Sequence, residues 1–257
     1  MVEFLEIMSG HSKWSTIKRQ KGITDIKRGL TFTKVANVIT IAVRLGGSSD
    51  PDSNPRLRVA VEEARAVNMP RENIQRAIDR GLGKLPGQTI EEVVYEGFGP
   101  GKVAFLVEGV TDNKLRTLQE IKSLFEHSGG SLAGQGAVSY MFDKKGQIRI
   151  KGKGGSSEEE MLELIDLGAE DVEDYLDQNL QEYLVYTEAT NVAEVSTKIT
   201  QAGYPVQSQN LVMKPKVLQQ ITDAQIAKKV LEFTGKLEEH NDIQKVWANF
   251  DIPDNLL

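Results

Sequence analysis

A cluster of basic residues near the start of the chain has the composition needed to bind a polyanion. Residues 11–29 hold six Lys or Arg and a single Asp, together with His11 and Trp14. Cationic side chains on one surface neutralise phosphates, and a Trp can stack on a base for about 1–3 kcal/mol. Trp14 could equally anchor the segment on the helices that follow, and a role for His11 stays open. We predict a phosphate-binding arm made of Lys13, Trp14, Lys18, Arg19, Lys21, Lys27, Arg28 and Lys34.

The basic residues are concentrated in the first third of an otherwise acidic chain. The formal net charge is −6, yet residues 1–84 hold 15 Lys plus Arg against 9 Asp plus Glu, and the remainder holds 16 against 28. Such asymmetry indicates a polyanion-binding module joined to acidic domains. Arg71, Arg76 and Arg80 form a second, smaller basic patch within this module.

Motifs of the common enzyme classes are absent from the sequence. The three His are not paired at metal-ligand spacing, there is no Cys, and no G-x-S-x-G nucleophile elbow occurs. The glycine-rich GFGPGK has Glu96 where a phosphate-binding Walker loop needs Gly, so it reads as a turn. His127 is better explained by a helix C-terminus than by catalysis. We therefore predict no enzyme activity, no catalytic residue, no cofactor, no metal and no small-molecule substrate.

An acidic segment allows two interpretations. Residues 158–177 contain ten carboxylates and no basic side chain. They could form a divalent-metal site through Glu163 and Asp166, or imitate a nucleic acid. A solvated helix face over an apolar stripe is the simpler interpretation, and we prefer it. The stripe would consist of Met161, Leu162, Ile165 and Leu167.

Composition predicts a soluble protein of the cytoplasm. The 257 residues can fill two or three domains, and no apolar run reaches the 18 residues of a membrane span. The first eight residues resemble no targeting signal, and the lack of Cys suits a reducing compartment. We expect no membrane partner.

The first 84 residues read as a small helical bundle. Phe32, Val35 and Ile39, continued by Ala42 or Val43, recur on one helix face, and Asn54-Pro55 is a typical helix start. The second helix would bury Leu57, Ala60 or Val61, and Ala64. A third helix opening at Pro70 would bury Ile74, Ala77 and Ile78 and end with Gly81 at the left-handed position.

The periodicity changes from helical to alternating after a linker at 81–87. Strands are predicted at 91–97 and 102–110, joined by the GFGPGK turn, and a helix at 113–130. Residues 137–142 and 147–152 would form a hairpin around 143–146. The remaining elements alternate between strand and helix, which indicates an α+β fold with antiparallel sheets. The last helix and strand could complete either of the two sheet units.

Short motifs in a fixed order resemble one known family. GHSKW at 10–14, NMPRENIQRAI at 68–78, YEGFGPG at 95–101, TDNKLRT at 111–117 and HSGGSL at 127–132 are similar to signatures of the YebC/PmpR family, as are NPRLR at 54–58 and ANFDI at 248–252. This family includes a mitochondrial translational activator of cytochrome oxidase subunit I. Lys102 departs from it, because members commonly carry a second Gly there. Members also usually begin two residues before GHSKW, which favours Met8 as the start.

The resemblance implies three domains and a regulatory function. The expected domains are a basic helical domain at 1–84, a middle α/β domain at 85–134 and 221–257, and an acidic α/β domain inserted at 135–220. Members are described as transcriptional regulators that bind DNA and as ribosome-associated translation factors that bind ribosomal RNA. We predict a transcriptional regulator that binds DNA through the basic domain, with the translation factor as the alternative and the ribosome as its partner.

Overall fold

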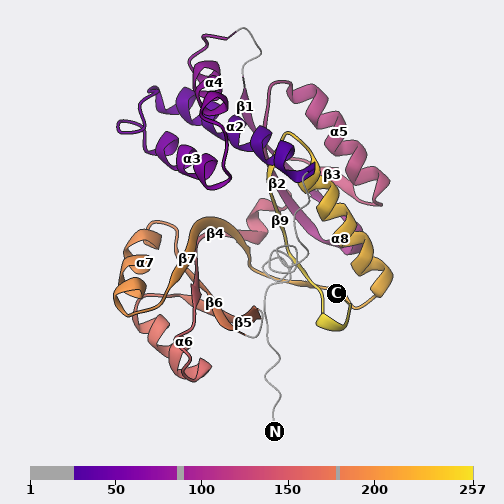
Figure 1. Cartoon of the computed structure of the whole chain (residues 1–257). Helices are drawn as coiled ribbons and strands as arrows, with labels where there is room; N and C mark the ends of the chain where they lie inside the picture. Colours follow the sequence, from indigo (N-terminus) through magenta and orange to yellow (C-terminus); the bar gives the residue numbers. More distant parts are fainter. Residues whose placement is uncertain (1–25, 86–89, 178–179, 257) are drawn as a thin grey trace. The chain divides into compact units, whose positions relative to one another are not determined.

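The structure is a computed structural model that describes residues 26–85, 90–177 and 180–256, and the chain divides into two compact units. We call them the bundle–sheet unit, within 21–139 and 221–248, and the insert unit, within 140–220 and 249–254. Helices and antiparallel sheets occur together, so the predicted α+β class is confirmed (Figure 1). The predicted domain boundaries stay a prediction. Among the described helices, none has the length and apolar character needed to cross a membrane.

Three helices form the N-terminal part of the bundle–sheet unit: α2 (Ile26–Gly46), α3 (Pro55–Ala66) and α4 (Arg71–Gly81). Asn54 caps α3 as predicted, because its Oδ1 accepts the Leu57 N–H at 3.1 Å. Its amide also donates to the Ala42 carbonyl at 2.9 Å and thereby ties α3 to α2. The predicted core positions are buried in one cluster: Val35, Ile39, Ala42, Val43, Leu57, Ala60, Val61, Ala64, Ile74, Ala77 and Ile78.

The end of α4 differs from the prediction. The helix continues through Gly81, and the left-handed residue is Gly83, with φ +71°. Gly81 has a different use, since a Cβ there would lie 2.7 Å from both the Thr40 carbonyl oxygen and the Val43 Cβ. The glycine therefore lets the last turn of α4 approach α2 closely.

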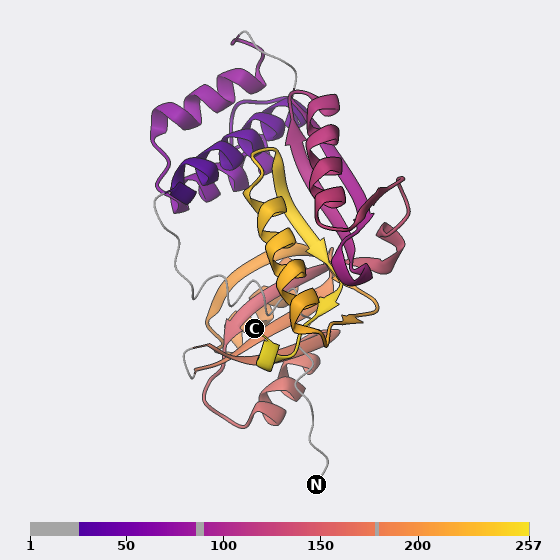
Figure 2. The same ribbon diagram turned by 90° about the vertical axis from the view of Figure 1, so that its right-hand side faces the viewer.

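The first sheet has the strand order β3-β1-β2-β9 and is antiparallel throughout. Its strands are β1 (Glu91–Phe98), β2 (Ala104–Thr111), β3 (Ser131–Ala133) and β9 (Ile243–Ala248). Helices α5 (Lys114–His127) and α8 (Ala224–Glu239) lie side by side on it (Figure 2). Phe105, Phe125 and Phe233 meet edge to face between these elements, with ring centroids 4.9–6.3 Å apart. The last helix and strand thus complete the sheet that begins with β1.

The second sheet forms the insert unit, in the order β5-β6-β4-β7. Its strands are β4 (Phe142–Lys151), β5 (Asp171–Asp177), β6 (Leu180–Glu188) and β7 (Val206–Pro215), with helices α6 (Ser157–Asp166) and α7 (Val192–Gln201). A short parallel pair joins β8 (Gln219–Gln220) to β10 (Phe250–Asp251). Single 3₁₀ turns lie at Pro100–Lys102, Ser139–Met141 and Asp254–Leu256.

The predicted hairpin around 143–146 is wrong. Those residues lie inside the continuous strand β4, whereas residues 137–141 form a turn and a 3₁₀ segment. This position of the strand requires glycine, because a Cβ at residue 146 would lie 2.7 Å from Thr187 Oγ1 and from the Val192 Cβ. Its role is close approach to α7, not a turn.

The acidic segment 158–177 is a helix followed by a strand. Leu164 is fully buried, and Glu160 is buried with its carboxylate accepting the N–H groups of Lys153 and Gly155. Leu162 and Ile165 are exposed, so the predicted apolar stripe is wrong at these two positions. Met161 and Leu167 pack against the core of the insert unit as predicted, and Leu164 is the buried residue between them.

Replacing Lys102 by Gly should stabilise the protein. Lys102 has φ +60° directly after Gly101 at φ +68°, a conformation that costs a side-chain-bearing residue about 1–2 kcal/mol. Glycine removes that strain but increases the entropy of the unfolded chain, so we expect a net gain of up to about 1 kcal/mol in the free energy of unfolding. Urea denaturation would measure it. Lys102→Ala is the control, because it removes the charge and keeps the strain; an equal gain in that variant would contradict the explanation.

Candidate nucleic-acid interface

Most of the predicted arm lies outside the described residues. Two further members, Lys27 and Arg28, lie in the first turn of α2, and only their backbone is described. The phosphate-binding arm therefore stays a prediction. The members outside the described residues are Lys13, Trp14, Lys18, Arg19 and Lys21.

Lys34 has a structural contact. Its half-buried side chain donates a hydrogen bond of 2.6 Å from Nζ to the carbonyl of Glu238, in the last turn of α8. A cation there complements the negative end of the helix dipole. Lys34 thus links α2 to the C-terminus of α8 in this structure, and its role in phosphate binding stays a prediction.

The arginines of α4 differ in how they are paired. Arg71 and Arg76 are exposed, and within the described ranges neither has a hydrogen bond or an ion pair. Arg65 on α3 shares this property. Arg80 is half-exposed and lies 3.8 Å from Asp112, a weak contact that leaves much of its guanidinium free. As far as the described residues go, the guanidinium groups of Arg71 and Arg76 are therefore available to an external anion.

A groove of about 230 Å³ runs between α2 and α4. Asn73, Arg76 and Arg80 line one wall at helical spacing, and the acidic residues of α4 are not part of the lining. The opposite wall and the floor are largely apolar. Helix α2 contributes Phe32, Thr33, Ala36 and Thr40, and α4 also contributes Ala77.

Sequence reasoning missed this groove. It placed Phe32 in the core and treated Arg76 and Arg80 as surface charges, and it did not consider Asn73. The spacing of residues 73, 76 and 80 on one helix face was a usable signal. The facing wall depends on how α2 packs on α4, which no pattern within one helix can reveal.

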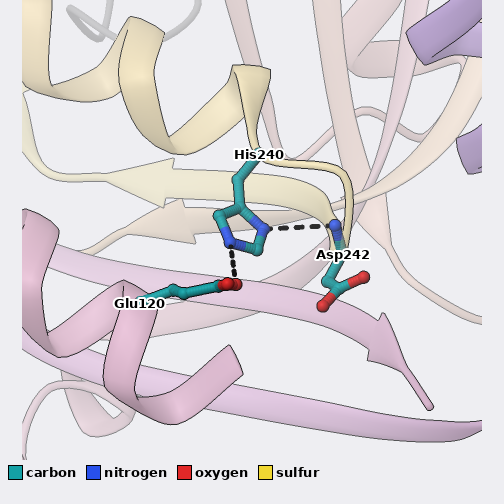
Figure 3. A group of neighbouring side chains, drawn as sticks. All are labelled: Glu120, His240 and Asp242. Carbon is teal, nitrogen blue, oxygen red and sulfur yellow. Dashed lines mark hydrogen bonds and ion pairs between the residues drawn. The ribbon is translucent and has the colours of Figure 1, made fainter. Parts of the chain in front are cut away.

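Glu120, His240 and Asp242 form a second cluster, with ligand-type atoms within 4.8 Å of one another (Figure 3). The Asp242 N–H donates to His240 Nδ1 at 3.2 Å. Nε2 must then carry the proton, and it donates to Glu120 at 3.0 Å. Arg116 donates to Asp242 Oδ2 at 2.7 Å and places a positive charge beside the cluster. Since the imidazole presents no free lone pair and a guanidinium is adjacent, this is an ion-pair network and a poor metal site.

Asp242 is the buried centre of that network. Burial alone would raise the pKa of its carboxyl group, but hydrogen bonds from Thr117 and Arg116 outweigh it and hold the pKa below the usual range. The ionised carboxylate joins α5 to the turn between α8 and β9. Its function is structural in this geometry.

Glu163, one of the two carboxylates considered for a metal site in 158–177, is also engaged. Glu163 accepts from Lys153 Nζ at 2.8 Å and from the Tyr204 hydroxyl at 2.7 Å. In the described part of the chain, no three metal-ligating side chains of this segment come together. The geometry gives no support to a metal site there.

Two family models cover nearly the whole chain. The model described as the TACO1/YebC protein N-terminal domain matches residues 12–84, and the TACO1/YebC second and third domain matches residues 90–250. The chain belongs to the TACO1/YebC family. The family resemblance found in the sequence motifs is thereby confirmed.

Relatives of this TACO1/YebC chain carry a regulatory name. A protein of Chloroflexus aurantiacus is 47% identical over 97% of this chain and 98% of its own, and one of Syntrophomonas wolfei is 42% identical over 97% and 99%. Both are named probable transcriptional regulatory protein. The crystal structure of a conserved hypothetical protein from Aquifex aeolicus is 42% identical, has a TM-score of 0.75, and covers 90% of this chain and 93% of its own. These names support a regulatory role and point away from catalysis.

Replacing Asp242 by Asn should lower the free energy of unfolding of this protein by an amount that depends on pH. Hydrogen bonds to charged groups contribute about 1.5–3 kcal/mol, so we expect a loss of this order at pH 7. A carboxyl group with a lowered pKa stabilises the folded state above its unfolded pKa, and the contribution disappears as the pH falls through the folded pKa. The difference between wild type and variant should therefore shrink below about pH 4.

Urea denaturation at pH 7 and pH 3 would measure both free energies of unfolding. Glu120→Gln is the matched control, because that carboxylate is exposed and should contribute less than about 0.5 kcal/mol. A loss that is the same at both pH values would refute the assigned role of the charge.

Proposed function

We propose that this chain is a non-enzymatic, nucleic-acid-binding regulatory protein that binds phosphates through its N-terminal helices and basic arm. The observation that carries the proposal is the pair Arg71 and Arg76, exposed on α4 and unpaired among the described residues. Two other cations of the same unit are paired: Arg56 lies 3.4 Å from Glu92, and Lys114 pairs with Glu91. Guanidinium groups that have no partner among the described residues, in a domain whose sequence also carries a basic arm, suit a polyanionic partner.

The names of the relatives favour DNA as the nucleic acid. In that form of the proposal, the protein is a transcriptional regulator of the cytoplasm that contacts the DNA backbone. The alternative is a translation factor that binds ribosomal RNA on the ribosome. Both use the same cations, because phosphate contacts position a protein without reading sequence.

Neutralising the basic residues should weaken binding and lower its dependence on salt. We expect the slope of log K against log salt for duplex DNA to fall by about 0.9 for each phosphate contact removed. The combined change of Lys18, Arg19 and Lys21 to Gln tests the arm. The double change Arg71→Gln and Arg76→Gln tests α4. Fluorescence anisotropy at several salt concentrations would measure both slopes.

The control removes two positive charges from another helix of the same unit. Lys228 and Lys229 are exposed on α8, and changing both to Gln lowers the net charge by the same amount as the α4 double variant. Its salt slope should match wild type. If the salt slope of the α4 variant matches that of this control, α4 is not in the interface. If the salt slope of the arm variant matches wild type, the arm is not in the interface.

Ultraviolet crosslinking in growing cells would decide between the two nucleic acids. Bound RNA and bound DNA are purified and sequenced in parallel. Crosslinks concentrated at promoter DNA support the transcriptional regulator. Crosslinks concentrated in ribosomal RNA support the translation factor, and an absence of both above background contradicts nucleic-acid binding altogether.

A further inference from the structure

The groove between α2 and α4 has the chemistry of a site for a single nucleotide. Its apolar part is formed by Phe32, Ala36 and Ala77. Phe32 packs against the bundle core and remains partly exposed, so an aromatic surface is held rigidly at the groove. An aromatic ring in such a position is a sequence-tolerant platform for an unstacked base.

The polar groups of the groove complement the remaining parts of a nucleotide. Asn73 lies at the wall, and within the described residues its side-chain amide has no hydrogen-bond partner. An amide offers both a donor and an acceptor, which is the pairing capacity of a base edge. Arg76 is one helical turn further along, and its guanidinium, which has no partner within the described ranges, suits a phosphate. One groove thus holds an aromatic ring, a side-chain amide and a cation, which suit a base, its polar edge and a phosphate.

The dimensions limit what the groove can accept. Sites for drug-sized ligands measure about 300–1,000 Å³, whereas this groove has a volume of about 230 Å³. A base stacked inside a duplex cannot reach a floor between two helices. A nucleotide turned out of a loop or bulge can, and RNA presents such nucleotides routinely.

We propose that the groove binds one unpaired nucleotide of a folded RNA, with the base on Phe32, its edge at Asn73 and its phosphate at Arg76. The inference rests on the proposed nucleic-acid binding and favours its RNA-binding form. Thr40 supports the floor, because its hydroxyl lies 2.8 Å from the Ala36 carbonyl and 3.1 Å from the Ala77 carbonyl and bridges the two helices. Arg71, on the same helix, would contact the backbone beside the bound nucleotide.

The test compares RNA hairpins that are identical except for one bulged nucleotide. Four hairpins carry A, C, G or U as the bulge, a fifth is fully paired, and a DNA hairpin carries the same bulge. Anisotropy titrations with the full chain should give affinities at least 10-fold higher for a bulged RNA than for the paired RNA and the bulged DNA. A 5-iodouridine bulge should photo-crosslink to Phe32.

Variants separate the groove from general phosphate binding. Phe32→Leu keeps an apolar side chain in the bundle and removes the aromatic platform, so the preference for the bulge should fall by about 5- to 150-fold. Asn73→Ala should also reduce this preference. Gln75→Ala is the matched control, because that exposed amide lies on the same helix outside the groove and bonds to Asp79. Circular dichroism and thermal unfolding confirm that each variant is folded.

The outcomes separate this inference from the function beneath it. Equal affinity for bulged and paired RNA, or a bulge preference that Phe32→Leu leaves unchanged, would overturn the groove assignment and leave phosphate binding in place. A preference for the bulged DNA would overturn the assignment to RNA. If no hairpin or duplex binds at all, the proposed function fails together with the inference.

Discussion

Helix α2 packs on two partners at once, and the arrangement of the bundle–sheet unit depends on this. One side of the helix buries Val35 and Ile39 against α3 and α4. Further along, Ile41 packs with Ile90 and Val110 at the start of the first sheet, and Arg44 donates to the Ile90 carbonyl. A helix held on both sides cannot rotate without breaking one of the two contacts. The orientation of α2, and with it the wall of the groove that α2 contributes, is therefore fixed relative to the rest of this unit.

This constraint explains how a small bundle can leave polar groups free without losing stability. Its apolar interior is continuous, and Asn54, one of the polar side chains buried there, forms hydrogen bonds to both α2 and α3. Among the described residues, the side chains of Arg71 and Asn73 have no hydrogen-bond or ion-pair partner, so they are available for a ligand. By contrast, the insert unit pairs its internal charges: Arg149 is buried with Glu182 and Asp177.

Local patterns predicted the elements, and non-local contacts produced the errors. The helices at 55–66 and 71–81 follow from an Asn-Pro start and a regular apolar face, and these signals lie within one turn of the residues concerned. Gly81 and Gly146 were both assigned to turns, because glycine commonly marks one. In the structure both are glycines because another element passes within contact distance of the backbone. That reason lies far away in the sequence and cannot be read from neighbouring residues.

The same limit applied to the candidate site. Composition identified the cationic region and α4 as its second patch. The groove could not be predicted without knowing how α2 packs on α4. The Asp242 network could not be predicted without knowing that Arg116 and Asp242, far apart in sequence, meet in the bundle–sheet unit. A metal site was only the alternative for the acidic segment, and sequence could not test it because it does not show the partners of the carboxylates. In the structure, Lys153 and Tyr204 both donate to Glu163.

The position of β9 has a consequence for the order in which the protein folds during synthesis. Strand β2 gains its second neighbour only from residues 243–248, and Phe105 and Phe125 gain their third ring only from Phe233. A chain emerging from the ribosome therefore makes the N-terminal helices and the whole insert sheet before the first sheet can be completed. Until then an apolar surface and an unpaired strand edge stay open, which is the state in which nascent chains bind chaperones or aggregate. The last thirty or so residues act as a closing segment, so premature termination of translation late in the message would expose the core of a domain begun more than a hundred residues earlier.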